Sequence, residues 1–401
     1  MKIFEIGTGY TSIPARMGAA TEIVVEELTI AMRKLGIDVT IIDIKDNNRK
    51  ITDLPITEVY MPQFFSSTDT KLGIVHKLKR VLYSISLTYK LHTLIRQNRD
   101  EKIILHFHNQ YNLFFFLKLT PKSFLKSVTI GYTVHSYIWF GKWEMVKKSI
   151  SKRYFQEVYC CQHADKVYVL NDIVSNMLVN HYQVDADRII PVINGVNVNV
   201  YNIAAADRDV VNKLRKQYKL VNKHVIFQAG SICDRKNQLG TLKLLLPIMK
   251  QRKDIAFIYA GGIIDLEYAH EIELLALQEH VKDRVLYMGE VAPGKQLNDL
   301  YALSNVAILN SKQESFALVI AEALSASKPI FICEEILNSL VFWGKNEGKG
   351  IIRIKDSFGA DLEKLLEDKN YYQDMQAKGR NFIVNEFSWE VAAQIYLKSF
   401  M

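Results

Sequence analysis

Two glutamates, Glu314 and Glu322, stand eight residues apart in a segment that follows a short apolar run. On a helix, which rises about 1.5 Å per residue, they would lie roughly 12 Å apart along the axis. That separation is too long for an acid and a base that act on one glycosidic bond. It fits two ends of one nucleotide sugar, with Glu314 near the sugar and Glu322 near the ribose. Two solvated helical residues are the alternative interpretation.

The residues between the two glutamates predict an anion site. Phe316, Ala317 and Leu318 would begin the helix, so their backbone N–H groups have no partner within it. A helix N-terminus carries partial positive charge, and it therefore suits the diphosphate of a nucleotide sugar.

A second loop runs from Gly230 to Lys236, directly after the apolar run His224–Ala229. Gly230 permits a close backbone turn. Arg235 and Lys236 could neutralise a leaving diphosphate, because cationic donors act where negative charge develops. Simple contact with solvent is the alternative for both side chains.

Histidines follow two apolar runs of the N-terminal half. His135 comes directly after Val128–Val134 and is the candidate catalytic histidine. His106 and His108 alternate at another strand end, where packing or loop anchoring is the simpler role. We expect no metal site, since no cluster of His, Asp and Glu has ligand spacing and no Asp-x-Asp ends a strand.

The first predicted strand runs into a loop that ends at Gly18. Gly7 and Gly9 superficially match a dinucleotide fingerprint, but Ser12 occupies the third glycine position and no short turn into a helix follows. A long loop that faces the ligand is therefore expected here, and a dinucleotide cofactor is not.

Strands with adjacent carboxyl ends must position these loops. Short apolar runs alternate with helical patterns in the first half, and the expected strands there are Lys2–Ile6, Asp38–Ile44, Lys102–His108, Val128–Val134 and Lys166–Leu170. The alternation starts again near residue 224, with expected strands at His224–Ala229, Ile255–Ala260, Val285–Met288, Val306–Leu309 and Pro329–Ile332. This rhythm predicts an α/β fold with two mostly parallel sheets that are covered by helices. The turn residues Asn194 and Gly195 lie between the two series, so we divide the chain into residues 1–197 and 198–385.

The composition is that of a globular protein. About half of the residues are hydrophobic and 23% are charged. With 401 residues, the chain is too long for one ordinary core, so two domains are expected. We expect no transmembrane helix and no signal peptide. The four cysteines lack metal-ligand spacing and fit reduced thiols, so a cytoplasmic location is expected.

Positive charge is concentrated in one part of the chain. Residues 71–153 hold sixteen Lys or Arg and three acidic residues, whereas the whole chain has a net charge of +8. A solvated face is one interpretation, and a surface for an anionic acceptor or an anionic membrane is the other. Within this region, Val75–Arg96 predicts a basic amphipathic helix with an apolar side of Val75, Leu78, Leu82, Ile85, Tyr89 and Leu91 or His92. No nucleic-acid motif accompanies it.

In order and spacing, these segments resemble the family 4 glycosyltransferases of GT-B fold, which are retaining and metal-independent. Glu314–Glu322 resembles the E-x7-E motif, the most specific element of the family, and Gly230–Lys236 resembles its phosphate loop. The resemblance covers nearly the whole chain. Further segments that resemble family motifs are Gly18–Glu22, His106–His108, Thr133–His135, Ala164–Val169, Pro191–Val196, Tyr259–Gly262, Tyr287–Val291 and Phe387–Trp389.

The resemblance implies two Rossmann-like domains that face a central cleft. The acceptor would bind to residues 1–197 and the donor to 198–385, and a helix in 386–401 would pack back on the first domain. The implied catalytic residues are Glu314, His135 and Lys236. The implied donor-binding residues are Gly18, Ser231, Arg235, Lys236, Glu290, Val291, Phe316, Ala317, Leu318 and Glu322.

The sequence departs from the family pattern at several positions. Ser231 stands where the family usually has an arginine, and Arg235 could replace it. Ala317 and Ser327 replace glycines, and Asn197 replaces an aspartate of the hinge.

The function that the resemblance implies is retaining transfer of a hexose-type sugar from a UDP- or GDP-sugar, without a metal or other cofactor. The acceptor would be a glycan, a lipid-linked sugar or a protein in cell-surface glycan biosynthesis, and the enzyme could bind peripherally to the inner face of the membrane. The alternatives are a GT-B sugar-nucleotide epimerase or phosphorylase, or an inactive partner subunit.

Overall fold

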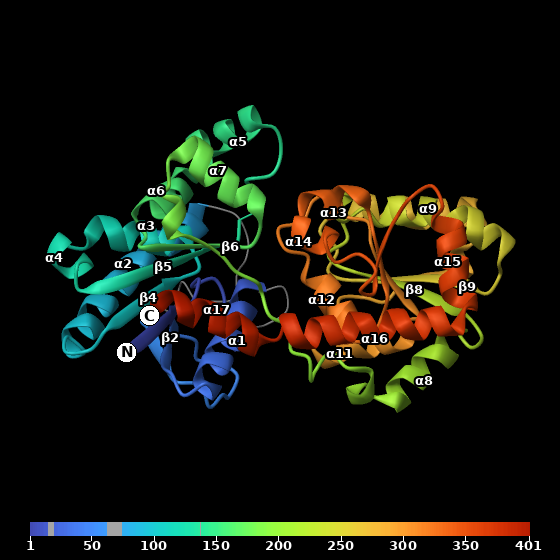
Figure 1. Cartoon of the computed structure of the whole chain (residues 1–401), viewed down its shortest axis with the longest axis horizontal. Helices are drawn as coiled ribbons and strands as arrows, with labels where there is room; N and C mark the ends of the chain where they lie inside the picture. The colour runs from blue at the N-terminus through green and yellow to red at the C-terminus, as the bar shows by residue number, and fades with distance from the viewer. Residues whose placement is uncertain (15–19, 62–73, 137) are drawn as a thin grey trace. The chain divides into compact units, whose positions relative to one another are not determined.

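The computed structural model describes residues 1–14, 20–61, 74–136 and 138–401 (Figure 1). Contacts divide the chain into two compact units, residues 1–195 with 389–401 and residues 196–388. Each unit is a parallel sheet with helices on its faces. The expected limits at residues 197 and 385 fall close to the borders of these units.

The sheet of the N-terminal unit has seven strands in the order β3-β2-β1-β4-β5-β6-β7, and every pairing is parallel. Its strands are β1 (Lys2–Ile6), β2 (Asp38–Ile44), β3 (Ile56–Val59), β4 (Ile103–Phe107), β5 (Val128–Val134), β6 (Lys166–Val169) and β7 (Ile189–Pro191). The prediction of a parallel sheet is confirmed. Two strands that the sequence analysis missed, β3 and β7, are short and lie at the two edges.

The helices of this unit cover both faces of its sheet. They are α1 (Ala20–Lys34), α2 (Ile74–Gln97), α3 (Gln110–Leu119), α4 (Lys122–Leu125), α5 (Trp143–Ser149), the π-helix η2 (Ile150–Tyr154), α6 (Phe155–His163), α7 (Asp172–Tyr182), the 3-10 turn η3 (Ala186–Arg188) and α17 (Trp389–Phe400).

Alternation along the strands assigns residues to the two faces. On β1, Phe4 packs in the core that lies under α2 and α3, whereas Ile3 packs in the core formed with α1 and α17. Glu5 therefore points to the side of α1 and α17, as Ile3 does. This assignment decides which helices surround the only carboxylate of that strand.

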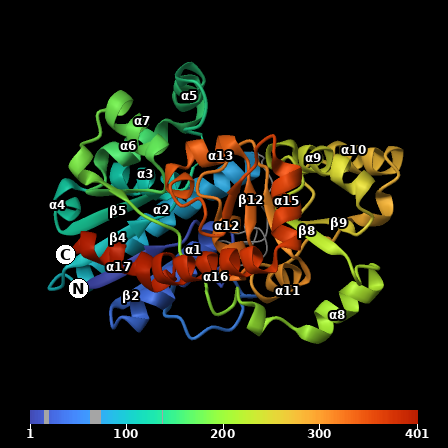
Figure 2. The ribbon, with the colours of Figure 1, turned by 45° about the vertical axis from the view of Figure 1, so that its right-hand side comes forward.

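The last helix of the chain, α17, belongs to the N-terminal unit, and it lies beside α1 in both views of the ribbon (Figures 1 and 2). Trp389, at its start, comes so close to Gly195 that a Cβ on the glycine would lie 2.6 Å from the Trp389 Cα. Only glycine fits there, which explains the Asn-Gly pair in physical terms. The expected return of the C-terminal helix to the first unit is confirmed.

The basic helix α2 corrects one detail of the sequence analysis. It buries Tyr83, Leu87 and Leu91, which recur every four residues and pack in the core with α3. Of the expected apolar side, Leu91 is buried and Leu82 packs against this core, whereas Leu78 and Tyr89 are 50% and 69% exposed. The helix has apolar residues on more than one side, so the spacing alone did not select the buried stripe.

The C-terminal unit has a six-stranded parallel sheet in the order β10-β9-β8-β11-β12-β13. Its strands are β8 (His224–Ala229), β9 (Ile255–Ala260), β10 (Val285–Tyr287), β11 (Val306–Leu309), β12 (Ile330–Ile332) and β13 (Ile351–Arg353). Five of these strands were expected from the sequence. The sixth, β13, is a three-residue edge strand that carries little periodic signal.

Helices again cover both faces of this sheet. They are α8 (Arg208–Gln217), α9 (Gln238–Gln251), α10 (Leu266–Gln278), α11 (Lys295–Leu303), α12 (Leu318–Ser325), α13 (Glu334–Ser339), α14 (Val341–Gly344), α15 (Phe358–Glu367) and α16 (Lys369–Glu386), with the 3-10 turns η4 (Ile203–Ala205), η5 (Asp234–Lys236) and η6 (Lys282–Arg284). Among all described residues, no helix is both long and apolar enough to cross a membrane.

Candidate functional site

The loop after β8 turns back on the strand that it leaves. Gly230 has a φ of 142°, and a Cβ at this position would lie 3.4 Å from the side chain of Lys236. Lys236 ends the turn η5, and its carbonyl accepts a 2.7 Å hydrogen bond from Gln228 Nε2 on β8. The 3.4 Å separation is an ordinary contact, so the φ of Gly230, which an L side chain rarely adopts, is what favours glycine at this turn.

Lys236 meets Glu314 across 78 residues of sequence. Its Nζ donates a 2.5 Å hydrogen bond to Glu314 Oε1, and the two side chains are only 13% and 8% exposed. Nη1 of Arg235 lies 3.8 Å from the other carboxylate oxygen of Glu314 and donates to the carbonyl of Gln313 at 3.1 Å. Two cations that sequence analysis selected therefore share one carboxylate, which it also selected.

The backbone also ties these two loops together. The N–H of Lys312 donates to the carbonyl of Arg235 at 2.8 Å, and Asn237 Nδ2 donates to the carbonyl of Asn310 at 3.0 Å. These two contacts join the loops independently of the Lys236–Glu314 pair and so help to position it.

Helix α12 begins next to Glu314. Its N-cap residue, Ala317, has no side chain that could cap the first N–H groups, and a helix N-terminus favours an anion. The N-cap residue Ala317 has φ 63° and ψ 59°, a left-handed conformation that costs a non-glycine residue roughly 1–2 kcal/mol. The indole N–H of Trp343 donates to the carbonyl of Phe316 at 2.7 Å and holds the preceding turn. Leu318 is the first residue of the helix.

Glu322 lies about one turn along α12 from its first residue, Leu318. Burial raises the pKa of Glu322 to about 6, although hydrogen bonds from Tyr201 and Tyr301 and the charge of Lys236 act in the opposite direction. The hydroxyl of Tyr301 lies 3.4 Å from Oε2. Its carboxylate is thus held by tyrosines and sits close enough to Lys236 to be influenced by its charge.

The loops after β9 and β10 approach the loop after β8. A Cβ on Gly261 would lie 2.2 Å from the carbonyl oxygen of Gly230, and the N–H of Gly261 donates to Gly289 at 3.0 Å. A Cβ on Gly262 would lie 3.1 Å from Oε1 of the exposed Glu290. These glycines explain how three loops converge at one edge of the sheet.

The other expected donor residues have plainer positions. The carbonyl of Ser231 accepts a 2.9 Å hydrogen bond from Gln238 Nε2. Val291, next to Glu290, is partly buried. Gly18 lies outside the described residues.

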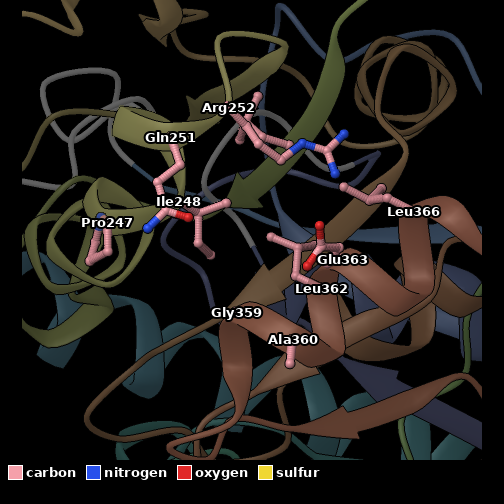
Figure 3. A pocket seen from close by; sticks show the side chains of 10 residues that line it. Pro247, Ile248, Gln251, Arg252, Gly359, Ala360, Leu362, Glu363 and Leu366 are labelled. Carbon is pink, nitrogen blue, oxygen red and sulfur yellow. The ribbon is translucent and has the colours of Figure 1, made fainter.

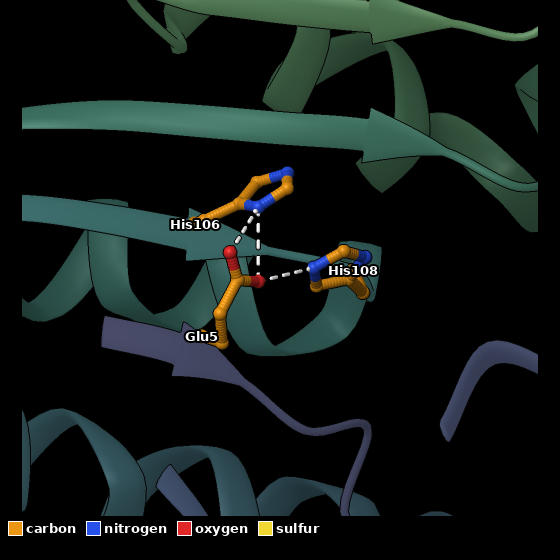
Figure 4. A group of neighbouring side chains, drawn as sticks. All are labelled: Glu5, His106 and His108. Carbon is orange, nitrogen blue, oxygen red and sulfur yellow. Dashed lines mark hydrogen bonds and ion pairs between the residues drawn. The ribbon is translucent and has the colours of Figure 1, made fainter. Parts of the chain in front are cut away.

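In the N-terminal unit, His135 follows β5 and contacts a second histidine. Its Nε2 lies 3.0 Å from Nδ1 of His108, which follows β4, and the two rings stack with centroids 5.3 Å apart. Nε2 of His108 lies 2.8 Å from Oε2 of Glu5 on β1. Nδ1 of His106 lies 3.0 Å from Oε1 and 2.9 Å from Oε2 of the same carboxylate. Figure 4 shows Glu5 between His106 and His108.

Burial and charge set the protonation of this histidine cluster. Burial raises the pKa of Glu5, but the attraction of His106 and hydrogen bonds from His106 and His108 outweigh it and lower that pKa to about 2. Burial and the neighbouring His106 lower the pKa of His108 to about 4. Burial, His108 and His106 also hold the pKa of His135 well below its usual value. Within this cluster, Glu5 is therefore ionised, and His108 and His135 are neutral.

Sequence reasoning missed Glu5. The signal was present, because Glu5 is a carboxylate inside the otherwise apolar strand Lys2–Ile6, and a buried charge needs partners. The partners come from the neighbouring strand β4, since the register pairs Glu5 with His106. His106 and His108 do anchor the strand ends, as expected for them.

Glu5, His106 and His108 are the group of described residues that could offer three ligand atoms to a metal. Their N···O separations of 2.8 to 3.0 Å, however, are those of direct hydrogen bonds. Each imidazole nitrogen that faces Glu5 has a carboxylate oxygen that can accept its hydrogen bond. These contacts therefore fit a hydrogen-bond network better than a metal site.

A cavity of about 330 Å³ lies elsewhere in the C-terminal unit, between α9 and α15 (Figure 3). Ile255, the first residue of β9, lines it together with Ile248, Arg252 and Leu362. The cavity is therefore at the edge of the sheet where strands begin, opposite the loops described above. Residues that the sequence analysis selected do not line it.

Comparison with known proteins matches both halves of the chain. Residues 21–200 match the model of "Glycosyltransferase Family 4", and residues 210–382 match the model of "Glycosyl transferases group 1". The alpha-galactosylglucosyldiacylglycerol synthase of Streptococcus pneumoniae is 25% identical over 262 residues, which is 62% of this chain and 64% of that protein. The chain spans less than two thirds of the length of the curated relatives it matches.

Solved structures share the fold over the whole chain. Anabaena HepE, solved with UDP and glucose, aligns with a TM-score of 0.71 at 14% identity and covers 100% of this chain and 99% of its own. The catalytic domain of starch synthase IV from Arabidopsis thaliana, solved with ADP and acarbose, aligns with a TM-score of 0.75 at 14% identity, over 100% and 98%. The chain has the GT-B fold and belongs to the glycosyltransferases of family 4 type.

Proposed function

We propose that this chain is a retaining glycosyltransferase that moves a hexose-type sugar from a UDP- or GDP-sugar to a glycan, lipid-linked or protein acceptor in cell-surface glycan biosynthesis. One observation carries the proposal: Lys236 and Glu314 form a 2.5 Å pair beside the start of α12, with Arg235 near the same carboxylate. The two cations Lys236 and Arg235, next to a helix N-terminus, suit a diphosphate.

Each donor-site residue then has a role that follows from its position. Lys236, Arg235 and the first N–H groups of α12 stabilise the diphosphate as negative charge develops on it. Glu314 contacts the sugar, and its carboxylate is already oriented by Lys236. Glu322 accepts hydrogen bonds from the ribose. The oxygen of the acceptor hydroxyl bonds to the anomeric carbon on the face from which the diphosphate leaves, and the leaving phosphate takes the proton.

The proposal needs no metal or other cofactor. The charge that a metal would neutralise is met by Arg235, Lys236 and the helix N-terminus. Full activity in the presence of a chelator is the expected result, and a requirement for Mn²⁺ or Mg²⁺ would contradict this part of the proposal.

We also propose that the enzyme works in the cytoplasm against an anionic membrane surface. The four cysteines are free thiols, which fits a reducing compartment. In the N-terminal unit, Met145 and Phe155 are 66% and 48% exposed, and the exposed cations Lys147, Lys148 and Arg153 lie between them in sequence. Apolar side chains among cations favour anionic lipid surfaces.

The vesicle test separates this surface from a merely solvated face. Co-sedimentation of the chain with phosphatidylglycerol vesicles, but not with phosphatidylcholine vesicles, is expected at low salt. Replacement of Lys147, Lys148 and Arg153 by Gln should abolish it. Equal binding to both kinds of vesicle, or to neither, would contradict the membrane proposal and leave the transferase proposal intact.

A thermal-shift screen of UDP- and GDP-sugars tests the main proposal. A true donor raises the melting temperature by mass action, and the donor that does so should then be consumed only when an acceptor is present. Release of an epimerised sugar without acceptor would indicate an epimerase, and dependence on inorganic phosphate a phosphorylase. Binding of nucleotide without any transfer would indicate an inactive partner subunit.

A further inference from the structure

The histidine cluster of the N-terminal unit forms an ordered chain of hydrogen bonds. The chain runs from Nε2 of His135 to Nδ1 of His108 at 3.0 Å, and from Nε2 of His108 to Oε2 of Glu5 at 2.8 Å. His108 therefore uses its two nitrogens on two different neighbours, His135 and Glu5. In a neutral imidazole, one nitrogen donates and the other accepts, so the state of one ring fixes that of the next.

Glu5 fixes the direction of this chain. Its carboxylate is fully buried and ionised, so both of its oxygens can only accept. Nε2 of His108 must therefore carry the proton that faces Glu5. Since His108 is neutral, its Nδ1 is bare and must accept from Nε2–H of His135. Nδ1 of His135 is then left with a lone pair.

His106 contacts both oxygens of the Glu5 carboxylate, with Nδ1 3.0 Å from Oε1 and 2.9 Å from Oε2. Nε2 of His106 lies 2.7 Å from the hydroxyl of Thr133. That hydroxyl lies 3.2 Å from the hydroxyl of Tyr396 on α17. Because His106 faces both oxygens and His108 faces Oε2, the carboxylate cannot rotate away from His108 without loss of a buried hydrogen bond.

We propose that Glu5 is a positioning residue, which acts through His108 to hold His135 in the Nε2–H tautomer, so that Nδ1 of His135 accepts a hydrogen bond from a substrate hydroxyl. His135 is only partly buried and follows the carboxyl end of β5, where ligands of parallel sheets bind. Across the described residues, its one hydrogen bond is that to His108. The role in substrate binding rests on the proposed transferase function, whereas the tautomer does not.

A hydroxyl is the group that fits this arrangement. A bare imidazole nitrogen accepts a proton from a neutral O–H group, and it offers nothing to a phosphate, which at neutral pH presents acceptor oxygens. The sugar of the donor or the hydroxyl-rich acceptor would therefore contact His135, and the diphosphate would not.

Nuclear magnetic resonance of the full chain with ¹⁵N-labelled histidine tests the tautomer directly. The chain has ten histidines, and a His135→Gln variant assigns the resonances of His135 by their loss. Long-range ¹H–¹⁵N spectra should show a protonated Nε2 and an unprotonated Nδ1 for His135 in the wild-type protein. A proton on Nδ1 would overturn the proposal. Stoichiometric zinc or iron bound through Glu5, His106 and His108 would overturn it as well.

A kinetic comparison of Glu5→Gln with Glu157→Gln tests the consequence. An amide has one acceptor and one donor, so Gln at position 5 forces at least one facing imidazole to change its tautomer. We expect kcat/KM for the hydroxyl-bearing substrate to fall about two- to tenfold, the worth of one hydrogen bond. Glu157 is equally buried in the same unit and accepts a 2.7 Å hydrogen bond from Tyr132, so Glu157→Gln is a matched control that should leave kcat/KM unchanged.

The outcomes distinguish failure of the positioning role from failure of the proposed transferase function. A folded Glu5→Gln variant with wild-type kcat/KM, or an equal loss in Glu157→Gln, would overturn the positioning role. If Glu5→Gln does not fold, the wild-type spectrum alone decides the tautomer. If the wild-type chain transfers no sugar from any donor, the proposed function fails, and the spectrum still tests the hydrogen-bond chain.

Discussion

The two units hold their polar residues at strand ends in opposite ways. In the C-terminal unit, Lys236 and Arg235 share the carboxylate of Glu314, so the site consists of charges that face one another. In the N-terminal unit, one buried carboxylate, Glu5, orders the neutral imidazoles of His108 and His135. The first arrangement suits a ligand with a diphosphate, and the second suits neutral hydroxyl groups. The same fold thus provides an ionic site and a neutral one, and the strand ends alone do not decide which.

The largest expected effect comes from the ionic site. Lys236→Ala should lower kcat about 10²- to 10³-fold, as does the loss of one group that stabilises transition-state charge. Steady-state kinetics with the identified donor provide the measurement. The matched control is Lys312→Ala, since Lys312 is an exposed lysine of the facing loop that pairs with Asp234 at 2.5 Å. A similar loss in both variants would mean that total charge matters and that the position of Lys236 does not.

Glu314→Gln should have the next largest effect. The amide keeps the size of the side chain but loses the charge that orients Lys236, so we expect kcat to fall about ten- to a hundredfold, the worth of a charged hydrogen bond. Single-turnover transfer measures this loss without interference from product release. A wild-type rate would remove Glu314 from the reaction and weaken the contrast between the two units.

The pH dependence of donor binding sharpens the contrast further. Because burial raises the pKa of Glu322 to about 6, this carboxyl is ionised above that pH and protonated below it. Protonation removes acceptor capacity toward ribose hydroxyls, so the Kd of UDP or GDP should rise as the pH falls from 7 to 5. Calorimetry on the wild-type chain and on Glu322→Gln tests this expectation. The same pH profile in both would show that another group titrates.

The same raised pKa has a consequence for stability, with a definite sign. A carboxyl whose pKa is higher in the folded than in the unfolded chain destabilises the fold as the pH rises through about 6. Glu322→Gln should therefore raise the melting temperature above pH 6 and have little effect near pH 4.

The smallest expected effect concerns the backbone at α12. Ala317 has φ 63°, so Ala317→Gly should increase the free energy of unfolding by about 1 kcal/mol through relief of left-handed strain. Denaturant unfolding measures the difference. Ala326→Gly is the control, because Ala326 has φ −76° and gains nothing from glycine. Stabilisation by both substitutions, or by neither, would contradict the strain argument.

The C-terminal site could be predicted in more detail than the N-terminal one. Lys236 and Glu314 each follow a strongly apolar strand, so the parallel sheet alone brings them to one edge. The contact of Glu5 with His106 depends instead on the register between β1 and β4, which are separated by about a hundred residues. A single sequence does not contain that register, so the buried carboxylate was not selected.

Two features of the fold were also beyond the sequence pattern. The three-residue strand β13 is too short to show alternation, and the sheet forms it by pairing with β12. The left-handed conformations of Ala317 and Ser327 are kept although neither residue is a glycine. In both positions the surrounding turn determines the backbone, and it overrides the preference of the residue.

Hydrogen–deuterium exchange on the full chain, with and without the UDP- or GDP-sugar that stabilises it, tests the central claim most directly. The account predicts that the donor slows exchange in residues 229–237 and 310–319, the two loops that meet at Lys236 and Glu314. Protection confined to other segments, or no protection at saturating donor, would contradict the placement of the donor site in the C-terminal unit.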